Sequence, residues 1–328
     1  MSRKFIGAIS KRIFSSLITL FVLISFLFVI IRISPGNPAQ KYLSPEFSPQ
    51  LSKLVIQKFN LDQPLFEQYT SFLKNIFTGE FGISYNYHLP VLSVVWESLS
   101  FTLVFASISF TLEILFGFLL AIYVARKEKI WLDKLVSNFS LAIYSTPSFV
   151  LGLILILIFA IKLDVFPTSG LKSFDYDTFN FFEKFGNLFA HLVLPLITLS
   201  AAGVAVFYKY IRDNLKEVKN QPYILQLRAS GYSESEILLK HIIPNAIRPL
   251  ISVAGIELGI LLGGALVTEV IFGLPGMGRL TIDSILSRDY PLIIACSFTA
   301  GVLMILTNFI ADIIKMKLDP ASLGEHLI

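Results

Sequence analysis

Residues 135–161 read LVSNFSLAIYSTPSFVLGLILILIFAI, which is a run of 27 residues without a charged side chain. A helix of about 20 apolar residues spans the hydrocarbon of a bilayer, because a helix satisfies its own backbone hydrogen bonds there. The run is long enough to predict a transmembrane helix. Pro147 lies near its middle and lacks the backbone N–H that an unbroken helix needs. It therefore predicts a kink in this helix.

Five more apolar blocks repeat this pattern, and none of them shows the amphipathic stripe of a soluble helix. They are residues 13–31, 98–125, 186–208, 249–272 and 290–311. Hydrophobic residues make up 54% of the 328 residues and charged residues 15%, compared with about 25% charged residues in a soluble domain. The predicted fold class is therefore an all-α membrane protein with six transmembrane helices.

The first block resembles a signal peptide in position but not in length. Its apolar run exceeds the roughly 7–15 residues of a signal-peptide core. No small-x-small cleavage site follows it in residues 32–36. We therefore expect an uncleaved membrane anchor.

Basic residues are divided unevenly between the two sides of the predicted membrane. Six spans place both termini on one side, which carries 17 of the 27 Lys and Arg residues, while the other side carries 10. Cytoplasmic loops are enriched in Lys and Arg, so the sequence predicts cytoplasmic termini. The basic balance reflects this topology, since no stacking aromatics along a basic groove predict a nucleic-acid partner.

The predicted spans divide the chain into four regions. These are a cytoplasmic stub with the first transmembrane helix (1–33), an extracytoplasmic segment (34–97), a five-helix transmembrane core with a cytoplasmic loop at 209–248 (98–316), and a cytoplasmic tail (317–328). The extracytoplasmic segment is expected to form a small helical cap, with helices at 50–59 and 65–77.

The cytoplasmic loop carries start and stop signals for two helices. Residues 222–229 suit a helix with proline at its first position, and Gly231 lies just past its end. Ser233 and Glu236 have the spacing of a capping box for a second helix, and Pro244 precedes the return to the membrane. Two interpretations remain open: an amphipathic helix pair on the lipid surface, or a docking element for a cytoplasmic subunit.

This loop resembles the coupling loop of bacterial ABC importer permeases, whose core is Arg-Ala-Lys-Gly, then an apolar helix and Asn-Ala-x-x-Pro. The corresponding residues here are Arg228-Ala229-Ser230-Gly231 and Asn245-Ala246-Ile247-Arg248-Pro249. Leu227 and Arg228 stand where a wider form of the motif has an acidic residue, a departure that is usual in the peptide branch. The resemblance assigns ATPase coupling to Tyr223, Leu225, Arg228, Ala229, Gly231, Glu236, Leu239, Pro244 and Asn245.

Further motifs resemble the oligopeptide, dipeptide and nickel permease branch of that family. They include Ser34-Pro35-Gly36-Asn37-Pro38, Asn60-Leu61-Asp62-Gln63-Pro64 and Ser145-Thr146-Pro147. A last outer-loop motif contains Pro275, Gly276, Gly278, Arg279, Asp289, Tyr290 and Pro291. The order and spacing of these motifs extend the resemblance over essentially the whole chain.

The resemblance implies the fold of an ABC importer type I permease. It also implies a multi-pass permease subunit in the inner membrane of a bacterium, importing peptides or related small solutes. It implies four kinds of partner: the lipid bilayer, a second homologous permease, two cytoplasmic ABC ATPase subunits and an extracytoplasmic substrate-binding protein. This chain would supply half of the translocation pathway. ATP and Mg would be bound by the ATPase subunits, and this chain would bind no cofactor.

The sequence contains no evident site for chemistry of its own. A Gly-x-x-x-x-Gly-Lys-Ser/Thr phosphate loop is missing, and a tight turn explains Gly276-Met277-Gly278 better than nucleotide binding does. The four histidines are scattered, and the single Cys296 is expected to be a buried core residue. No catalytic residue, metal site or disulfide is therefore predicted.

Four acidic residues fall within or at the ends of predicted spans, where a lone charge costs about 2.5–3.5 kcal/mol. Glu113 and Glu257 lie deep and, together with Pro147, are candidate residues of a translocation pathway. For the two carboxyl groups, an interhelical hydrogen bond is the alternative. Glu269 and Asp312 lie near span ends, where we expect a solvated interface. An ion-coupled secondary transporter using Glu257 or Glu113 is the alternative function. Six spans without a homologous second half or an inverted repeat disfavour it.

Overall fold

The computed structural model describes residues 3–33, 63–247 and 249–318 of the chain. Every named element in these ranges is a helix, which confirms the predicted all-α class. The described residues form two compact units: unit 1 comprises residues 3–33, 63–102 and 275–306, and unit 2 comprises residues 103–247, 249–274 and 307–318. The predicted helix at 50–59 and the motifs at 34–38 and 60–62 lie outside the described residues.

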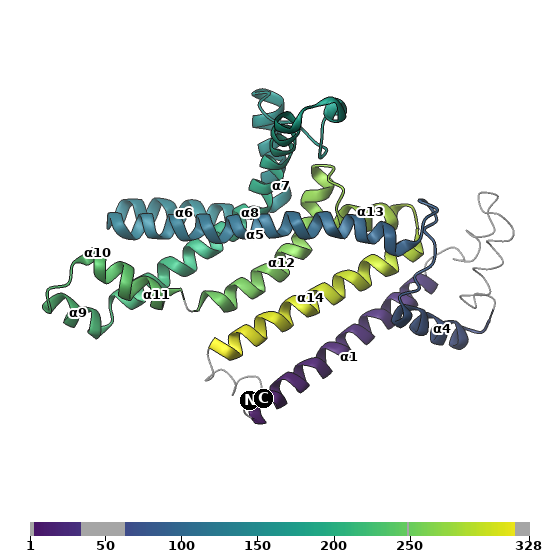
Figure 1. Ribbon diagram of the computed structural model, residues 1–328, viewed down its shortest axis with the longest axis horizontal. Coiled ribbons are helices and arrows are strands. Elements are labelled where there is room, and N and C mark those ends of the chain that lie inside the picture. Colours follow the sequence, from purple (N-terminus) through teal and green to yellow (C-terminus); the bar gives the residue numbers. More distant parts are fainter. Residues whose placement is uncertain (1–2, 34–62, 248, 319–328) are drawn as a thin grey trace. The chain divides into compact units, whose positions relative to one another are not determined.

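Unit 1 combines two long apolar helices with shorter ones. It contains α1 (Arg3–Ile33), α4 (Leu65–Thr78), α13 (Met277–Leu286) and the N-terminal parts of α5 (Val91–Lys127) and α14 (Tyr290–Leu318). α1 runs beside α14 (Figure 1), and the missing side chain of Gly301 leaves room there for Leu23. Ile24, Leu292 and Cys296 are fully buried in the core of the unit, so the interpretation of Cys296 as a core residue is confirmed.

The helix α4 covers the amphipathic stretch predicted at 65–77. Its Ile76 is buried while Phe66 and Phe77 are exposed. It ends at Gly79, whose φ of 76° is the left-handed conformation that glycine adopts without a steric cost. The prediction of a helix in this part of the segment is confirmed.

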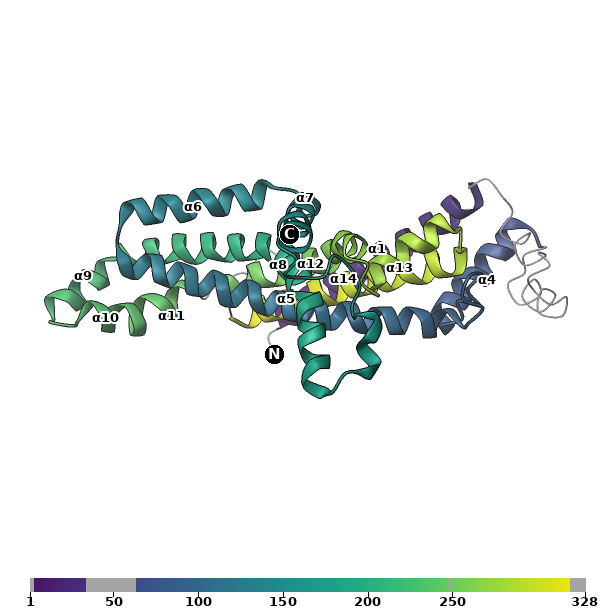
Figure 2. The ribbon, with the colours of Figure 1, turned by 90° about the horizontal axis from the view of Figure 1, so that it is seen from above.

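Unit 2 is organised around one long helix. It contains α6 (Ile130–Ser145), α7 (Ser148–Leu155), the π-helix η1 (Ile156–Lys162), the 3-10 helix η2 (Phe174–Thr178), α8 (Phe181–Lys219), α12 (Leu250–Ile271) and the remaining parts of α5 and α14. α5, α6 and α8 lie side by side (Figures 1 and 2). Asn180 and Glu183 form a reciprocal capping box at the start of α8, so two of the N–H groups at this end of the helix have acceptors.

The 27-residue uncharged run is broken at the predicted proline. α6 ends at Ser145 and α7 begins at Ser148, and the axes of the two helical pieces differ by 103° (Figure 1). Thr146 is extended, as expected for a residue before proline, and Pro147 occupies the N-cap of α7. The predicted kink is confirmed, but the bend is so large that the run is not one straight helix.

The number of membrane spans is only partly established by these helices. Within the described residues, α1, α5, α8 and α14 each contain a stretch long and apolar enough to cross a membrane, and the bent pair of α6 with α7 and η1 makes five at most. The predicted fifth span, residues 249–272, is covered by the 22-residue helix α12. Each predicted block thus lies on helices, while the count of six stays a prediction.

Candidate functional site

The segment from Pro222 to Ala246, here named the elbow, begins shortly after the end of α8 at Lys219. Its first helix is α9 (Pro222–Ala229), with Pro222 at the start, as the sequence predicts. Gly231 follows with a φ of 85°, a left-handed conformation that turns the chain sharply. The hydroxyl of Ser233 then accepts a hydrogen bond from Glu236 N (3.3 Å) and caps the next helix.

The second half of the elbow is a helix with a widened turn. It consists of α10 (Glu234–Ile237), the π-helix η3 (Leu238–Ile242) and α11 (Ile243–Ala246). Pro244 cannot donate the N–H that an α-helix needs at this point, and the wider turn before it accommodates the loss. Asn245 Nδ2 donates to His241 O (2.7 Å) and to the hydroxyl of Tyr223 (3.3 Å), so it links α11 back to α9.

The elbow is anchored by a few apolar side chains. Ile224 and Ile237 have no exposed surface, and Ile242 is nearly as buried. They belong to one apolar cluster with side chains of α5 and α8, namely Ala121, Val124, Phe207, Tyr208, Ile211 and Leu215. A continuous core therefore runs from the elbow into the long helices of unit 2.

The outer side of the elbow is exposed even where it is apolar. Leu225 is 69% exposed beside the fully buried Ile224, and Leu239 is 51% exposed. Tyr223 is partly exposed as well. These exposed apolar side chains make the outer side of the elbow a candidate surface for a partner.

Two exposed ion pairs stabilise the elbow, one across its turn and one within its second half. Arg228 Nε donates to Glu234 Oε1 (2.6 Å), and Lys240 Nζ donates to Glu236 Oε1 (2.6 Å). The hydrogen bond from Arg228 lowers the pKa of Glu234, and the hydrogen bond to Glu236 raises the pKa of Lys240. Only the Ser233 half of the predicted capping box is formed, because the Glu236 carboxylate pairs with Lys240.

The structure brings the nine predicted coupling residues together on the elbow. Tyr223, Leu225, Arg228 and Ala229 lie on α9, and Gly231 joins it to the second half. Glu236, Leu239, Pro244 and Asn245 lie on that second half, and all nine have some exposed surface. Their role in coupling stays a prediction.

A group of charged residues beside the elbow was missed by sequence reasoning. Asp133 at the start of α6 accepts two hydrogen bonds from Arg212 of α8 (Nε–Oδ1 2.5 Å and Nη2–Oδ2 2.6 Å) and one from Lys216 Nζ (2.6 Å). Lys219 Nζ donates to Glu128 in the turn between α5 and α6. The sequence shows only that the α5–α6 connection and the end of α8 are both rich in basic residues. It does not show which carboxylates pair with these basic residues.

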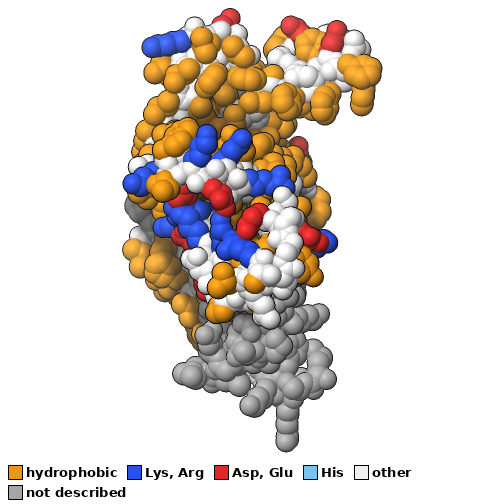
Figure 3. Space-filling model, turned by 90° about the vertical axis from the view of Figure 1, so that its left-hand side faces the viewer, with side chains coloured by type: hydrophobic (Ala, Val, Ile, Leu, Met, Phe, Trp, Pro, Cys, Tyr) orange, Lys and Arg blue, Asp and Glu red, His pale blue; other side chains and the backbone are white. Residues whose placement is uncertain are grey.

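These pairs border a cleft of about 840 Å³, here named the basal cleft, between the α5–α6 turn, the end of α8 and the elbow. Figure 3 shows the face that carries the elbow, where Lys and Arg side chains gather with Asp and Glu side chains and orange hydrophobic side chains lie above and beside them. The cleft thus combines charge with an apolar border.

Of the candidate pathway residues, Glu113 is the most deeply placed. It is 3% exposed on α5, and a Cβ added to Gly203 of α8 would lie 2.1 Å from its carboxyl carbon. Its Oε2 has no hydrogen-bond partner among the described residues. The carboxyl group therefore packs against α8 at Gly203, and its role in a pathway stays a prediction.

The other membrane-embedded positions have varied surroundings. Glu257 is partly buried on α12, and Pro147 is exposed at the break between α6 and α7. Glu269 is fully buried, so the interpretation of a solvated interface is wrong for this residue. Its nearness to the end of a predicted span could not show that neighbouring helices cover it.

In the outer-loop motif, Asp289 is the organising residue. It is fully buried, and its Oδ2 accepts hydrogen bonds from Ser84 Oγ (2.6 Å) and Asn86 N (3.1 Å). Its Oδ1 accepts from Leu292 N (3.3 Å) and so caps the first turn of α14. One carboxylate therefore fixes the loop before α5 to the turn before α14.

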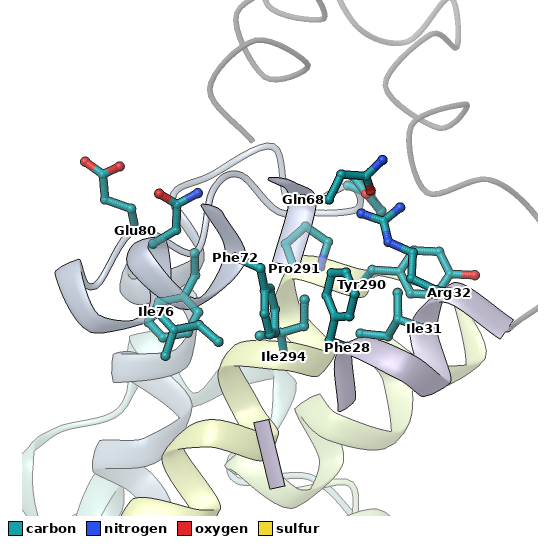
Figure 4. A pocket seen from close by; sticks show the side chains of 13 residues that line it. Phe28, Ile31, Arg32, Gln68, Phe72, Ile76, Glu80, Tyr290, Pro291 and Ile294 are labelled. Carbon is teal, nitrogen blue, oxygen red and sulfur yellow. The ribbon is translucent and has the colours of Figure 1, made fainter. Parts of the chain in front are cut away.

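The remaining motif residues divide into two places. Tyr290 and Pro291 line a small apolar cavity of about 90 Å³ together with side chains of α1 and α4 (Figure 4). The guanidinium of Arg32 lies over the ring of Phe28 there, 5.3 Å from its centre. Arg279 pairs with Asp283 (3.6 Å) within α13.

The expected tight turn lies earlier than Gly276-Met277-Gly278. Gly273 has the left-handed φ of 62°, while Gly276 is extended and precedes the first residue of α13. Met277 N donates to Thr102 Oγ1 (2.8 Å). In the described part of the chain, no group of three His, Cys, Asp or Glu side chains is placed to hold a metal ion.

Family models match almost the entire chain. The model described as binding-protein-dependent transport system inner membrane component matches residues 113–323, and the model of its N-terminal region matches residues 5–106. The glutathione transport system permease protein GsiC of Escherichia coli K12 is 33% identical over 311 residues, which cover 95% of this chain and 97% of GsiC. GsiC of Shigella flexneri serotype 5b gives the same identity and coverage.

Solved structures of ABC transporters share the fold. An inward-facing form of the MetNI methionine ABC transporter has a TM-score of 0.55 at 18% identity and covers 70% of this chain and 98% of that chain. An amino acid ABC transporter has a TM-score of 0.51 at 18% identity, with 69% and 94% covered.

Proposed function

Because this chain belongs to the family of binding-protein-dependent transport system inner membrane components and is a permease subunit of an ABC importer, we propose that its elbow is the surface on which separate ATPase subunits act. ATP and Mg would be bound and turned over by those subunits. This chain would contribute half of the translocation pathway and no catalytic residue.

The apolar core that joins the elbow to α5 and α8 is the observation that supports this role. Ile224 and Ile237 are fully buried in the same cluster as Phe207 and Ile211 of α8. A close-packed core transmits displacement because its side chains have no free volume to absorb it. A partner that moves the elbow would therefore move the long helices with it.

The substrate we propose is a peptide or a related small solute. The support is the similarity to GsiC, whose name assigns it to glutathione transport, over 95% of this chain. Glutathione is itself a short peptide derivative. Selection among such solutes would fall largely to a separate extracytoplasmic binding protein.

The proposed assembly contains this chain, a second homologous permease, two cytoplasmic ATPase subunits and the binding protein. The protein is a multi-pass inner membrane protein. The excess of Lys and Arg on one side supports cytoplasmic termini, a cytoplasmic elbow and an extracytoplasmic segment at 34–97. The orientation is tested with single cysteine variants at Ser235 of the elbow and at Ser173, which precedes η2 in the predicted outer connection before α8. A membrane-impermeant thiol reagent added from outside should label Ser173→Cys and not Ser235→Cys.

The experiment that tests the elbow's role uses two adjacent residues with opposite exposure. In Leu225→Ala, an exposed contact is lost while the fold is retained, so ATPase co-purification and uptake should fall at least tenfold at an unchanged amount in the membrane. In Ile224→Ala, a buried anchor is lost at a cost of about 2–5 kcal/mol, so the elbow itself should loosen.

The matched control is Leu286→Ala, which removes an equally exposed leucine from α13. It should leave ATPase co-purification unchanged. If the triple variant Tyr223→Ala, Leu225→Ala, Leu239→Ala still co-purifies with the ATPase subunits and transports normally, the elbow is not their docking surface. Uptake that survives depletion of ATP would instead favour the ion-coupled alternative.

A further inference from the structure

The basal cleft carries positive charge that the described part of the chain does not neutralise. Its acidic residues are already paired: Asp133 with Arg212 and Lys216, Glu128 with Lys219, and Glu234 with Arg228 of the elbow.

Two cations of the cleft remain, Arg126 and Lys129, on either side of the α5–α6 turn. Both are exposed, and neither forms an ion pair with any residue that the structure describes. A guanidinium presents two parallel N–H groups to a phosphate, and a nearby ammonium adds a point charge. The ligand that fits this pair is therefore an anion of the size and shape of a phosphate group.

The apolar border of the cleft indicates where such an anion would come from. Ile130 is 74% exposed and Trp131 is 62% exposed at the start of α6, beside Lys129. Exposed apolar side chains on a membrane helix face lipid, and tryptophan is enriched at the level of the headgroups. The α5–α6 turn thus lies at the membrane surface, within reach of phospholipid headgroups.

We infer that the basal cleft binds the phosphate of an anionic phospholipid between Arg126 and Lys129. Basic pockets between transmembrane helices are suited to anionic headgroups. The cleft's volume of about 840 Å³ leaves room for a headgroup, and Leu238 and Ile242 of the elbow provide an apolar wall.

The bound lipid would connect the membrane to the elbow. Ser235 and Leu238 of the elbow line the same cleft as Arg126. A headgroup held there would contact both the α5–α6 turn and the elbow, and so restrict their relative motion. Anionic lipid should therefore increase the protection of residues 222–246 against hydrogen exchange.

The test uses the complete importer complex in nanodiscs that contain phosphatidylglycerol or only phosphatidylcholine. The variant Arg126→Gln, Lys129→Gln should retain at least fivefold less phosphatidylglycerol by native mass spectrometry. The elbow of this variant should no longer gain hydrogen-exchange protection from phosphatidylglycerol. The matched control is Lys127→Gln, Lys134→Gln, which removes the same charge from exposed positions outside the cleft and should behave like the unmodified protein.

Equal retention of phosphatidylglycerol by the two double variants would overturn the inference. The inference would also be overturned if inorganic phosphate protected the elbow in detergent and phosphatidylglycerol did not, since the bound anion would then not be a lipid. A third contrary result is loss of the ATPase subunits in Arg126→Gln, Lys129→Gln with unchanged lipid retention, which would assign the cleft to the ATPase contact. These outcomes are separate from the Leu225→Ala test, because that residue does not line the cleft.

Discussion

The contact between α5 and α8 and the elbow that follows α8 both depend on glycine, but for opposite reasons. A Cβ at Gly117 of α5 would lie 2.6 Å from the Cβ of Phe207 and 3.1 Å from the backbone nitrogen of Tyr208. A Cβ at Gly231 of the elbow would meet no described atom within 4 Å, yet its φ of 85° disfavours any other residue.

This difference separates a contact set by space from a turn set by backbone conformation. At Gly117 the backbones of α5 and α8 are so close that there is no room for a methyl group. At Gly203 the space that a methyl group would need is filled by the carboxyl group of Glu113. The elbow is shaped by one turn and a few buried isoleucines, and its outside is open. The helix pair is thus suited to move as one body, and the elbow is suited to be held by a partner.

Gly117→Ala should have the largest effect on this comparison. The added methyl group meets backbone atoms of α8 and the Cβ atom of Phe207, which rotation of the side chain cannot move away, so α5 and α8 must separate. Overpacking of this kind costs about 1–3 kcal/mol. The free energy lost should appear as a lower midpoint of thermal unfolding for the purified complex and as a reduced amount in the membrane.

The control for this variant is Gly186→Ala, in the first turns of α8. No described atom lies within 4 Å of a Cβ at Gly186, and alanine favours a helix over glycine by up to about 1 kcal/mol. Its unfolding midpoint should be unchanged or higher. Equal midpoints for Gly117→Ala and Gly186→Ala would show that the close approach of α5 and α8 is not needed.

Gly231→Ala should have a smaller and more local effect. The left-handed conformation costs a residue with a Cβ about 1–2 kcal/mol, and this cost is confined to the turn between α9 and α10. Hydrogen exchange measured by mass spectrometry should increase in residues 222–246 and not in α5 or α8. Gly231→Asn should lose less protection, because asparagine tolerates this conformation better. A uniform increase over unit 2 would contradict the separation of the two regions.

The sequence predicts the elbow better than the helix contact, and the reason is physical. Proline at the start of α9, Gly231 after its end and the Ser233 cap act over a few residues, so their spacing is visible in the chain. Gly117 and Gly203 matter only because two distant segments meet. A glycine inside an apolar block gives no sign of which helix packs on it.

Bends and buried charges were also beyond the sequence. Pro147 predicts a kink, but the 103° bend depends on what surrounds α7, which a hydropathy pattern does not contain. The pairing of Asp133 with Arg212 joins residues 79 positions apart. The burial of Glu269 likewise depends on neighbouring helices. In each case a local pattern shows that a feature exists but not which segment completes it.

The smallest expected effect is that of Glu234→Gln, which removes the ion pair across the elbow turn. The hydrogen bond from Arg228 holds the pKa of Glu234 below its ordinary value of 4.5, so the pair stabilises the folded elbow above that pH. This stabilisation is lost as the pH falls through the lowered pKa. Because both side chains are exposed to solvent, the pair is screened and contributes little.

At pH 7, Glu234→Gln should therefore reduce the hydrogen-exchange protection of residues 222–246 by less than about threefold, and 0.5 M salt should remove the difference. As the pH falls from 4.5 through the lowered pKa of Glu234, the unmodified elbow and the variant should converge, once the intrinsic pH dependence of amide exchange is corrected. A loss as large as that of Gly231→Ala would mean that the ion pair, and not the left-handed glycine, sets the shape of the elbow. The elbow would then differ from the α5–α8 contact by depending on an ion pair, and the stabilisation from that pair would weaken at the ionic strength of the cell.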